Sequence, residues 1–133
     1  MDNPGVFTLA ALQITPDMPE TLLTPVTDLD GMTAVTIDAD FRYGSGGTSV
    51  TAIVATTFDG GVTFRHIARF DFTTASIVKQ CNLEGMLSKA VTTYADLSSQ
   101  SVNDGVLGDQ LAVLLTSVGN YSNTTLSIRA SVR

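Results

Sequence analysis

The chain contains one histidine and one cysteine, His66 and Cys81, the two side chains best suited to nucleophilic or metal chemistry. A catalytic triad needs a nucleophile beside the histidine, and no Gly-x-Ser-x-Gly elbow occurs in the chain. Structural zinc takes most of its ligands from Cys and His, which this chain cannot supply. We therefore predict no catalytic residue, no metal ligand and no cofactor. His66 is expected to be packed or at a subunit interface, and Cys81 to be a small buried or half-buried side chain.

Carboxylates offer two further chemistries. The segment 28–31, Asp-Leu-Asp-Gly, has the start of a calcium-loop spacing but lacks the later ligands and the terminal Glu, so a turn is the simpler interpretation. A pair of carboxylates could serve a glycosidase. Sugar sites usually stack rings on Trp or Tyr, and the chain has no Trp and only Tyr43, Tyr94 and Tyr121. The lack of Trp and the few Tyr residues therefore argue against a carbohydrate-binding role without excluding it.

Five charged residues are expected on the outer faces of two strands. Asp38 and Asp40 alternate with apolar residues on one strand, and Arg65, Arg69 and Asp71 do so on another. If these strands are neighbours, the charges form a cross-strand ladder in which each pair contributes a few tenths of a kcal/mol to about 1 kcal/mol. The same charges could instead contact a partner subunit.

A tight turn is predicted at residues 57–64, Thr-Phe-Asp-Gly-Gly-Val-Thr-Phe. This segment resembles the Asp-box hairpin, Ser-x-Asp-x-Gly-x-Thr-Trp, which is a structural motif of several unrelated β-folds. The resemblance implies that Asp59 caps the turn and that Phe64 packs beneath it. Gly60 and Gly61 would supply the backbone freedom that such a turn requires.

All four prolines lie in the first 33 residues. Proline fixes the backbone and removes an amide donor, so residues 1–33 are predicted to be an extended N-terminal arm with short strands near 7–14 and 20–26. Such an arm either covers an edge of its own domain or reaches a neighbouring subunit.

From residue 34 onward the hydrophobic period is two, which predicts half-buried strands. The clearest case is 34–43, where apolar residues alternate with Thr36, Asp38, Asp40 and Arg42. Further strands are expected at 48–58, 62–72, 74–79, 109–118 and 124–132, and a short helix could lie within 82–94. This spacing predicts an all-β, single-domain β-sandwich or jelly roll at residues 34–133, preceded by the arm.

Composition narrows the function. The 133 residues carry 13 acidic and 7 basic side chains, a net charge of −6, and include 19 Thr and 11 Ser. The acidic balance and the two lysines argue against nucleic acid as a partner. The longest apolar run, residues 111–115, is far shorter than a membrane helix, and no secretory signal is expected. Side chains such as Thr and Ser lose little rotamer entropy when buried, which favours a surface covered by other proteins.

Several segments of residues 34–133 resemble segments of small virion proteins of tailed bacteriophages and prophages. They are Asp-Phe-Arg-Tyr-Gly-Ser-Gly-Gly-Thr-Ser-Val at 40–50, the 57–64 turn, Gly-Val-Leu-Gly-Asp at 105–109, and Thr-Leu-Ser-Ile-Arg-Ala at 125–130. The resemblance implies a non-enzymatic virion protein made in the host cytoplasm. Its first expectation is a capsid decoration (cement) protein that bridges neighbouring subunits of the major capsid protein. A neck, tail or baseplate component and a host-surface carbohydrate-binding module are the alternatives.

On this hypothesis the protein is a homo-oligomer, expected to be a trimer, without a nucleic-acid or membrane partner. Its partner-binding residues would come from the arm, from the charged strand faces and from one closing turn. They are Phe7, Leu9, Leu12, Ile14, Asp38, Asp40, Arg65, Arg69 and Tyr121.

Overall fold

A computed structural model describes residues 4–133, which form strands and connections without any helix. No helix in this described part is long and apolar enough to cross a membrane. The strands are β1 (Gly5–Ile14), β2 (Met18–Leu22), β3 (Ala34–Arg42), β4 (Ser45–Gly46), β5 (Ser49–Thr56), β6 (Arg65–Phe72), β7 (Ile77–Glu84), β8 (Ser101–Val102), β9 (Leu111–Val118), β10 (Tyr121–Ser122) and β11 (Thr124–Val132).

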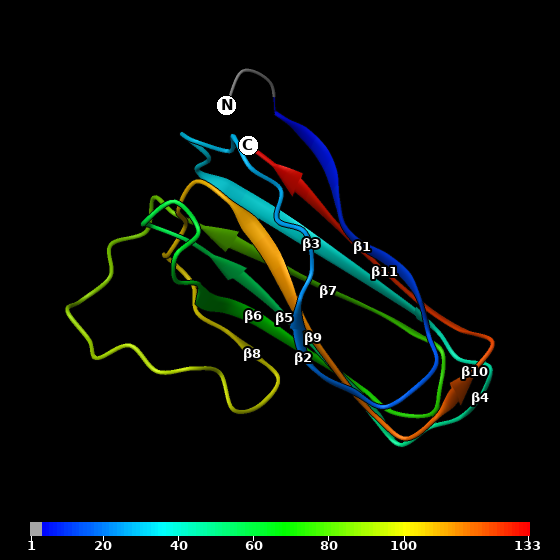
Figure 1. Cartoon of the computed structure of the whole chain (residues 1–133). Helices are drawn as coiled ribbons and strands as arrows, with labels where there is room; N and C mark the ends of the chain where they lie inside the picture. Colours follow the sequence, from blue (N-terminus) through cyan, green and yellow to red (C-terminus); the bar gives the residue numbers. More distant parts are fainter. Residues whose placement is uncertain (1–3) are drawn as a thin grey trace.

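Two antiparallel sheets make up the body of the molecule (Figure 1). The four-stranded sheet, here called sheet A, has the order β1-β11-β3-β7, and the five-stranded sheet B has the order β2-β9-β5-β6-β8. The short strands β10 and β4 pair at one end. The predicted all-β class is confirmed, and the two sheets pack together in a sandwich-like manner.

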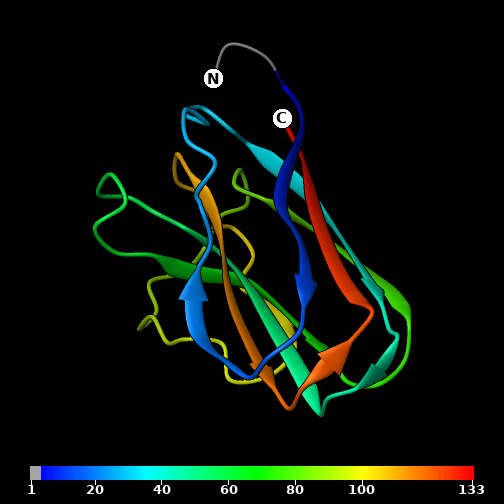
Figure 2. The ribbon, with the colours of Figure 1, turned by 45° about the vertical axis from the view of Figure 1, so that its right-hand side comes forward.

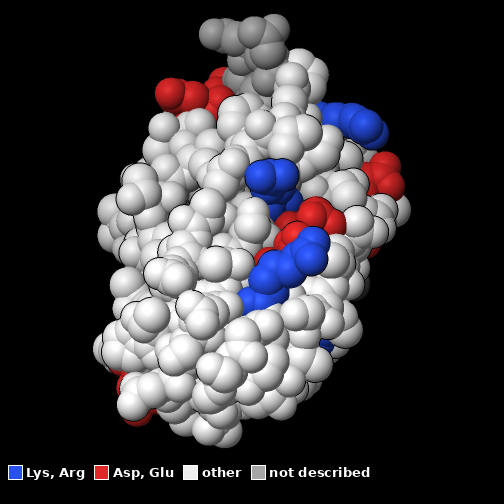
Figure 3. Space-filling view, turned by 90° about the vertical axis from the view of Figure 1, so that its right-hand side faces the viewer, with Lys and Arg blue, Asp and Glu red and all other residues white. Residues whose placement is uncertain are grey.

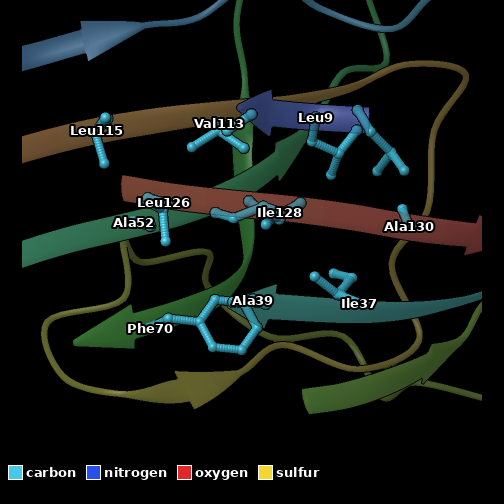
Figure 4. Packing of buried hydrophobic residues seen from close by; sticks show 14 of the residues in the cluster. Leu9, Ile37, Ala39, Ala52, Phe70, Val113, Leu115, Leu126, Ile128 and Ala130 are labelled. Atoms are coloured by element: carbon cyan, nitrogen blue, oxygen red, sulfur yellow. The ribbon is translucent and has the colours of Figure 1, made fainter. Parts of the chain in front are cut away.

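The core fills the space between the two sheets. Figure 4 shows apolar side chains from both sheets, among them Ile37 and Ile128 of sheet A and Val113 and Phe70 of sheet B, within one buried cluster. Phe41 stacks on Phe72 with ring centroids 4.9 Å apart and planes 13° apart. Burying one large apolar side chain stabilises a fold by about 1.5–3 kcal/mol. The apolar side chains buried between the two sheets are therefore the main contribution to stability.

Residues 5–22 supply one edge strand to each sheet (Figure 2). β1 pairs with β11 in sheet A, β2 pairs with β9 in sheet B, and the chain crosses between the sheets at residues 15–17. Beyond β2, Val26 forms a bridge with Leu111. Within residues 4–33 the N-terminal segment therefore supplies strands to both sheets, and an arm separate from the sandwich stays a prediction.

The connection between β7 and β8 contains no helix, so the helix considered within 82–94 is wrong. Residues 82–84 belong to β7, and residues 86–100 form an irregular loop that projects away from the sheets (Figure 1). Gly85 follows β7 and adds one more bond to its pairing with the β3 side, since its amide donates to the carbonyl oxygen of Thr33 at 2.7 Å. The β-branched residues that follow favour extended backbone over helix.

Candidate functional site

The outer face of sheet A is broad and poor in charge (Figure 3). The carboxylates of β3 on this face each lie beside a donor. The register between β11 and β3 places Arg129 opposite Asp38, and Gln80 of β7 donates to Asp38 Oδ1 at 2.7 Å. Arg42 Nε lies 2.9 Å from Asp40 Oδ1 on the same strand. Exposed pairs of this kind contribute about 0–1 kcal/mol to stability. Their effect is to leave a face with little unbalanced charge.

The predicted ladder between the two charged strands is wrong. Asp38 and Asp40 lie on β3 in sheet A, whereas Arg65 and Arg69 lie on β6 in sheet B, so the strands are not neighbours. Arg69 instead pairs with Asp71 on its own strand at 2.9 Å. The five charged side chains are exposed or half-buried, as alternation indicated, but strand order decides which of them meet.

His66 anchors the loop between β7 and β8 onto β6. Its Nδ1 accepts a hydrogen bond from the Leu97 amide at 3.1 Å, and its own amide donates to the Tyr94 hydroxyl at 2.8 Å. A register shift in β6 brings Ile67 into the core beside Ala68, while His66 stays outside that cluster. Strict alternation along 62–72 predicts His66 and Phe70 on one face, and this is wrong because the bulge reverses the alternation. The Nε2 of this packed histidine lies 3.8 Å from Asp96 Oδ1.

Asp59 caps the turn at 57–64 as its sequence predicts, whereas Phe64 is only half-buried and lies outside the core cluster. Asp59 Oδ1 accepts hydrogen bonds from the Thr57 hydroxyl at 2.8 Å and the Thr63 amide at 2.9 Å, and Oδ2 accepts from the Thr63 hydroxyl at 2.6 Å. These bonds, led by those from Thr63, lower the pKa of Asp59 to about 2. Gly60 and Gly61 have φ values of +73° and +95°. The turn is a structural cap.

Three of the predicted partner-binding residues are buried. Leu9 and Ile14 of β1 belong to the core, and Tyr121 is 2% exposed, so their prediction as surface contacts is wrong. A register shift between Thr8 and Ala10 brings Leu9 into the interior. Of the remaining arm residues, Phe7 and Leu12 are half-buried against the core.

Tyr121 closes the end of the core beside the β10–β4 pair. Its hydroxyl donates to the Thr73 carbonyl oxygen at 2.8 Å, and its ring meets Phe41 and Tyr43 edge-on at 6.1 Å each. Burial raises the pKa of Tyr121. The ring also leaves room only for glycine at position 47, because a Cβ there would lie 2.3 Å from the ring atoms. This tyrosine cannot stack on a sugar.

Cys81 lines a hollow of about 410 Å³ between the β7 edge of sheet A and the β6–β8 edge of sheet B. Burial, with a smaller effect of Asp104, raises the pKa of its thiol to about 11. A thiol in this state is a poor nucleophile near neutral pH. In residues 4–133 no three His, Cys, Asp or Glu side chains are placed to hold a metal ion. The expectation of no cofactor stays a prediction.

Exposed apolar side chains gather on two connections, which sequence alternation did not single out. Phe58 and Val62 lie between β5 and β6, and Met86 and Val91 lie between β7 and β8; all four are more than 60% exposed. Phe58, Val91 and Tyr94 line one hollow of about 470 Å³ together with Arg65 and Lys89. We call Phe58, Val62, Met86, Val91 and Tyr94 the apolar tip.

Arg65, one of the predicted contact residues, lies at the apolar tip. Its guanidinium lies over the Tyr94 ring, 5.0 Å from the ring centroid. Contiguous exposed apolar side chains mark interaction sites, and aromatic and Arg residues dominate binding energy at such sites. Arg65 and the apolar tip are therefore the best candidate contact surface among the described residues.

No protein-family model, curated protein or solved structure matches this chain.

Proposed function

We propose that this protein is a non-enzymatic virion structural protein, a capsid decoration protein that binds the major capsid protein and stabilises the assembled shell. The observation that carries the proposal is the apolar tip, in which Phe58, Val91 and Tyr94 line one hollow with Arg65, and Val62 and Met86 are exposed on the same two connections. A protein that binds only the assembled shell stabilises it by mass action and needs no catalytic chemistry.

The strand order supports a jelly roll as the finer fold. Taking the eight longer strands in chain order, sheet A contains the first, eighth, third and sixth, and sheet B contains the second, seventh, fourth and fifth. This is the order of two Greek keys rolled into a pair of four-stranded sheets, an architecture found in viral capsid and lectin domains. Fold likeness alone does not give function, so the tip remains the main argument.

The charge pattern suits burial against protein. A buried charge that lacks a partner is expensive, whereas the carboxylates of Asp38, Asp40 and Asp71 each already have a donor within 2.9 Å on this chain. The covering subunit then needs no matching charges. Nucleic acid is disfavoured as a partner because the chain has a net charge of −6.

The proposal is tested with capsids assembled from the encoding genome but without this protein. The purified chain should bind them at saturating, symmetric occupancy and raise their melting temperature. The variant Phe58→Asp should lose most of this binding, because it places a charge in the tip. Val118→Asp is the matched control, since Val118 is a similarly exposed apolar residue at the end of β9.

Two other outcomes would replace the proposal. Co-purification with isolated tails, without capsid binding, assigns the protein to the neck, tail or baseplate. Binding to a glycan array that Tyr94→Ala abolishes assigns it to a carbohydrate-binding module, because Tyr94 is the most exposed of the three tyrosines.

A further inference from the structure

β7 is an edge strand of sheet A with an unused set of backbone groups. It pairs only with β3, in a register that places Leu83 opposite Val35 and Cys81 opposite Ile37. The next position along, Gly85, donates its amide to the Thr33 carbonyl oxygen. Because hydrogen-bonded positions alternate along an antiparallel pair, the odd-numbered residues of β7 bond to β3. The even-numbered residues therefore direct their amides and carbonyls away from the sheet.

Three of these outward positions are open. Glu84 is capped, because its amide donates to Asp104 Oδ1 at 2.8 Å. Val78, Gln80 and Asn82 have exposed side chains, and no other described strand lies beyond them. Val78 is 52% exposed and its neighbour Ile77 is 45% exposed. The open edge is thus three residues long, bounded at one end and flanked by apolar surface at the other.

The other sheet edges carry features that hinder pairing with a further strand, and β7 lacks such features. β1 has a bulge at Thr8, and β2 contains Pro19 and an irregular register. The β6 edge is capped by Gln100, whose side chain accepts from the Asp71 amide at 3.1 Å. Bulges, prolines and covering groups are the usual means of blocking edge-to-edge association.

The lysine of β7 does not guard its edge. Lys79 Nζ donates to Gln100 Oε1 at 2.6 Å and to the Asp71 carbonyl oxygen. Its charge is therefore drawn inward, toward the edge of sheet B. β7 itself remains a regular strand without a bulge or a proline.

We propose that β7 pairs antiparallel with β7 of a second copy of this chain, about a twofold axis through Gln80, to form one continuous sheet. In this register Val78 lies opposite Asn82 of the partner subunit, and Gln80 lies opposite Gln80 of the partner subunit. All three open positions are then satisfied, in three hydrogen-bonded pairs of two bonds each.

Charge and hydrogen bonding select this register over its neighbours. A slip in one direction places Lys79 opposite Lys79 of the partner subunit, and like charges directly opposite are destabilising. A slip in the other direction leaves Val78 without a partner. Both slips retain only two of the three hydrogen-bonded pairs. In the proposed register Lys79 faces the uncharged Cys81 of the partner subunit.

The pairing stands on the geometry of β7 alone and does not depend on capsid binding. None of the apolar-tip residues belongs to β7, so the pairing uses no backbone group of the tip. The resulting sheet would have eight strands, within the range that twisted sheets reach.

Gln80→Pro tests the proposal while leaving the backbone pairing of β7 with β3 in place. It also removes the exposed side-chain bond from Gln80 to Asp38, and Gln80→Ala, which loses that bond but keeps the amide, is the control for this loss and should still dimerise. The Gln80 amide faces away from β3, and edge strands tolerate proline where the missing amide faces solvent. The variant should keep the β-sheet circular dichroism of the wild type. Losing one donor per copy should raise the Kd of the dimer roughly 30-fold or more. Thr92→Pro, in the exposed 86–100 loop, is the matched proline control and should dimerise like the wild type.

Two measurements decide the outcome. Light scattering with size-exclusion chromatography should give twice the chain mass for the wild type and a shift toward monomer for Gln80→Pro. Amide exchange should be slowed at Val78, Gln80 and Asn82 only in the dimer, whereas Lys79 and Cys81 are protected in both forms. A wild type that is monomeric at 100 μM, a trimer, or a dimer that survives Gln80→Pro would overturn the proposal. Fast exchange at the three open positions within a dimer would also overturn it.

Discussion

The residue whose substitution best separates a core role from a surface role is Tyr121. Its ring is 2% exposed and meets the rings of Phe41 and Tyr43 edge-on. Its hydroxyl makes one hydrogen bond, to the carbonyl oxygen of Thr73. Tyr121→Phe removes only the hydroxyl, and Tyr121→Ala removes the ring as well, so the pair of variants separates the two contributions.

The expected magnitudes follow from those contacts. Removing one partly buried hydrogen bond costs about 0.5–1.5 kcal/mol of unfolding free energy. Removing a buried aromatic ring costs about 3–5 kcal/mol, since it leaves a cavity between Phe41 and Tyr43. The loss of edge-on ring contacts contributes to that figure, at about 0.5–1.5 kcal/mol per pair. For a chain of this size the ring deletion corresponds to a fall in Tm of roughly 10–20 °C.

Urea unfolding followed by circular dichroism measures both variants, with equal m-values as the check that the two states are unchanged. The double variant Phe41→Leu with Tyr121→Ala should show a coupling free energy of about 0.5–1.5 kcal/mol. A loss below about 1 kcal/mol for Tyr121→Ala would refute the assignment of this ring to the core. The reasoning would also fail if Tyr121→Ala were stable but defective in ligand binding.

Three further predictions concern a turn, a thiol and a glycine. The folded pKa of Asp59 is about 2, below its ordinary 3.8, so its contribution is present above pH 3.8 and is lost as the pH falls through 2. Acid unfolding of Asp59→Asn should therefore show a shallower dependence on pH between about 5 and 2 than that of the wild type. Cys81, whose thiol pKa is about 11, should react with iodoacetamide at pH 8 at least tenfold more slowly in the folded chain than in urea; equal rates would contradict its burial. Gly47→Ala should lower the Tm more than Gly5→Ala, because a Cβ at Gly47 meets the Tyr121 ring whereas one at Gly5 meets nothing within 4 Å.

The sequence predicted the strands well where one face is continuously buried. β3 is the clearest case, because Val35, Ile37, Ala39 and Phe41 are all buried, as their period of two indicated. The last strand, 124–132, was also placed at its observed bounds. In these elements local alternation and tertiary burial agree, so the pattern alone is sufficient.

The errors share a physical cause, which is that single-residue bulges and strand order leave no periodic signal. The bulge at Leu9 places that side chain in the core, and the bulge at Ile67 moves His66 off the face that Phe70 shares with the core. The charged residues of β3 and β6 were read correctly as outward-facing, yet their partners depend on sheet order, which period cannot encode. The apolar tip was not predicted from the sequence. The exposure of a loop side chain depends on how the loop packs against the rest of the fold, which local alternation does not encode.

The pairing of β1 with β11 also governs how this chain can reach its fold. Gly5 pairs with Val132 and Ile14 pairs with Thr124, so the contact joins segments that lie far apart in sequence. During synthesis β1 has no partner in sheet A until residues 124–132 have left the ribosome. Sheets closed by such distant pairings fold slowly, in milliseconds to seconds, because loop closure must precede the contacts that reward it. The nascent chain therefore carries an unpaired apolar strand until β11 is complete, and that interval is when it is most open to association with a neighbouring nascent copy.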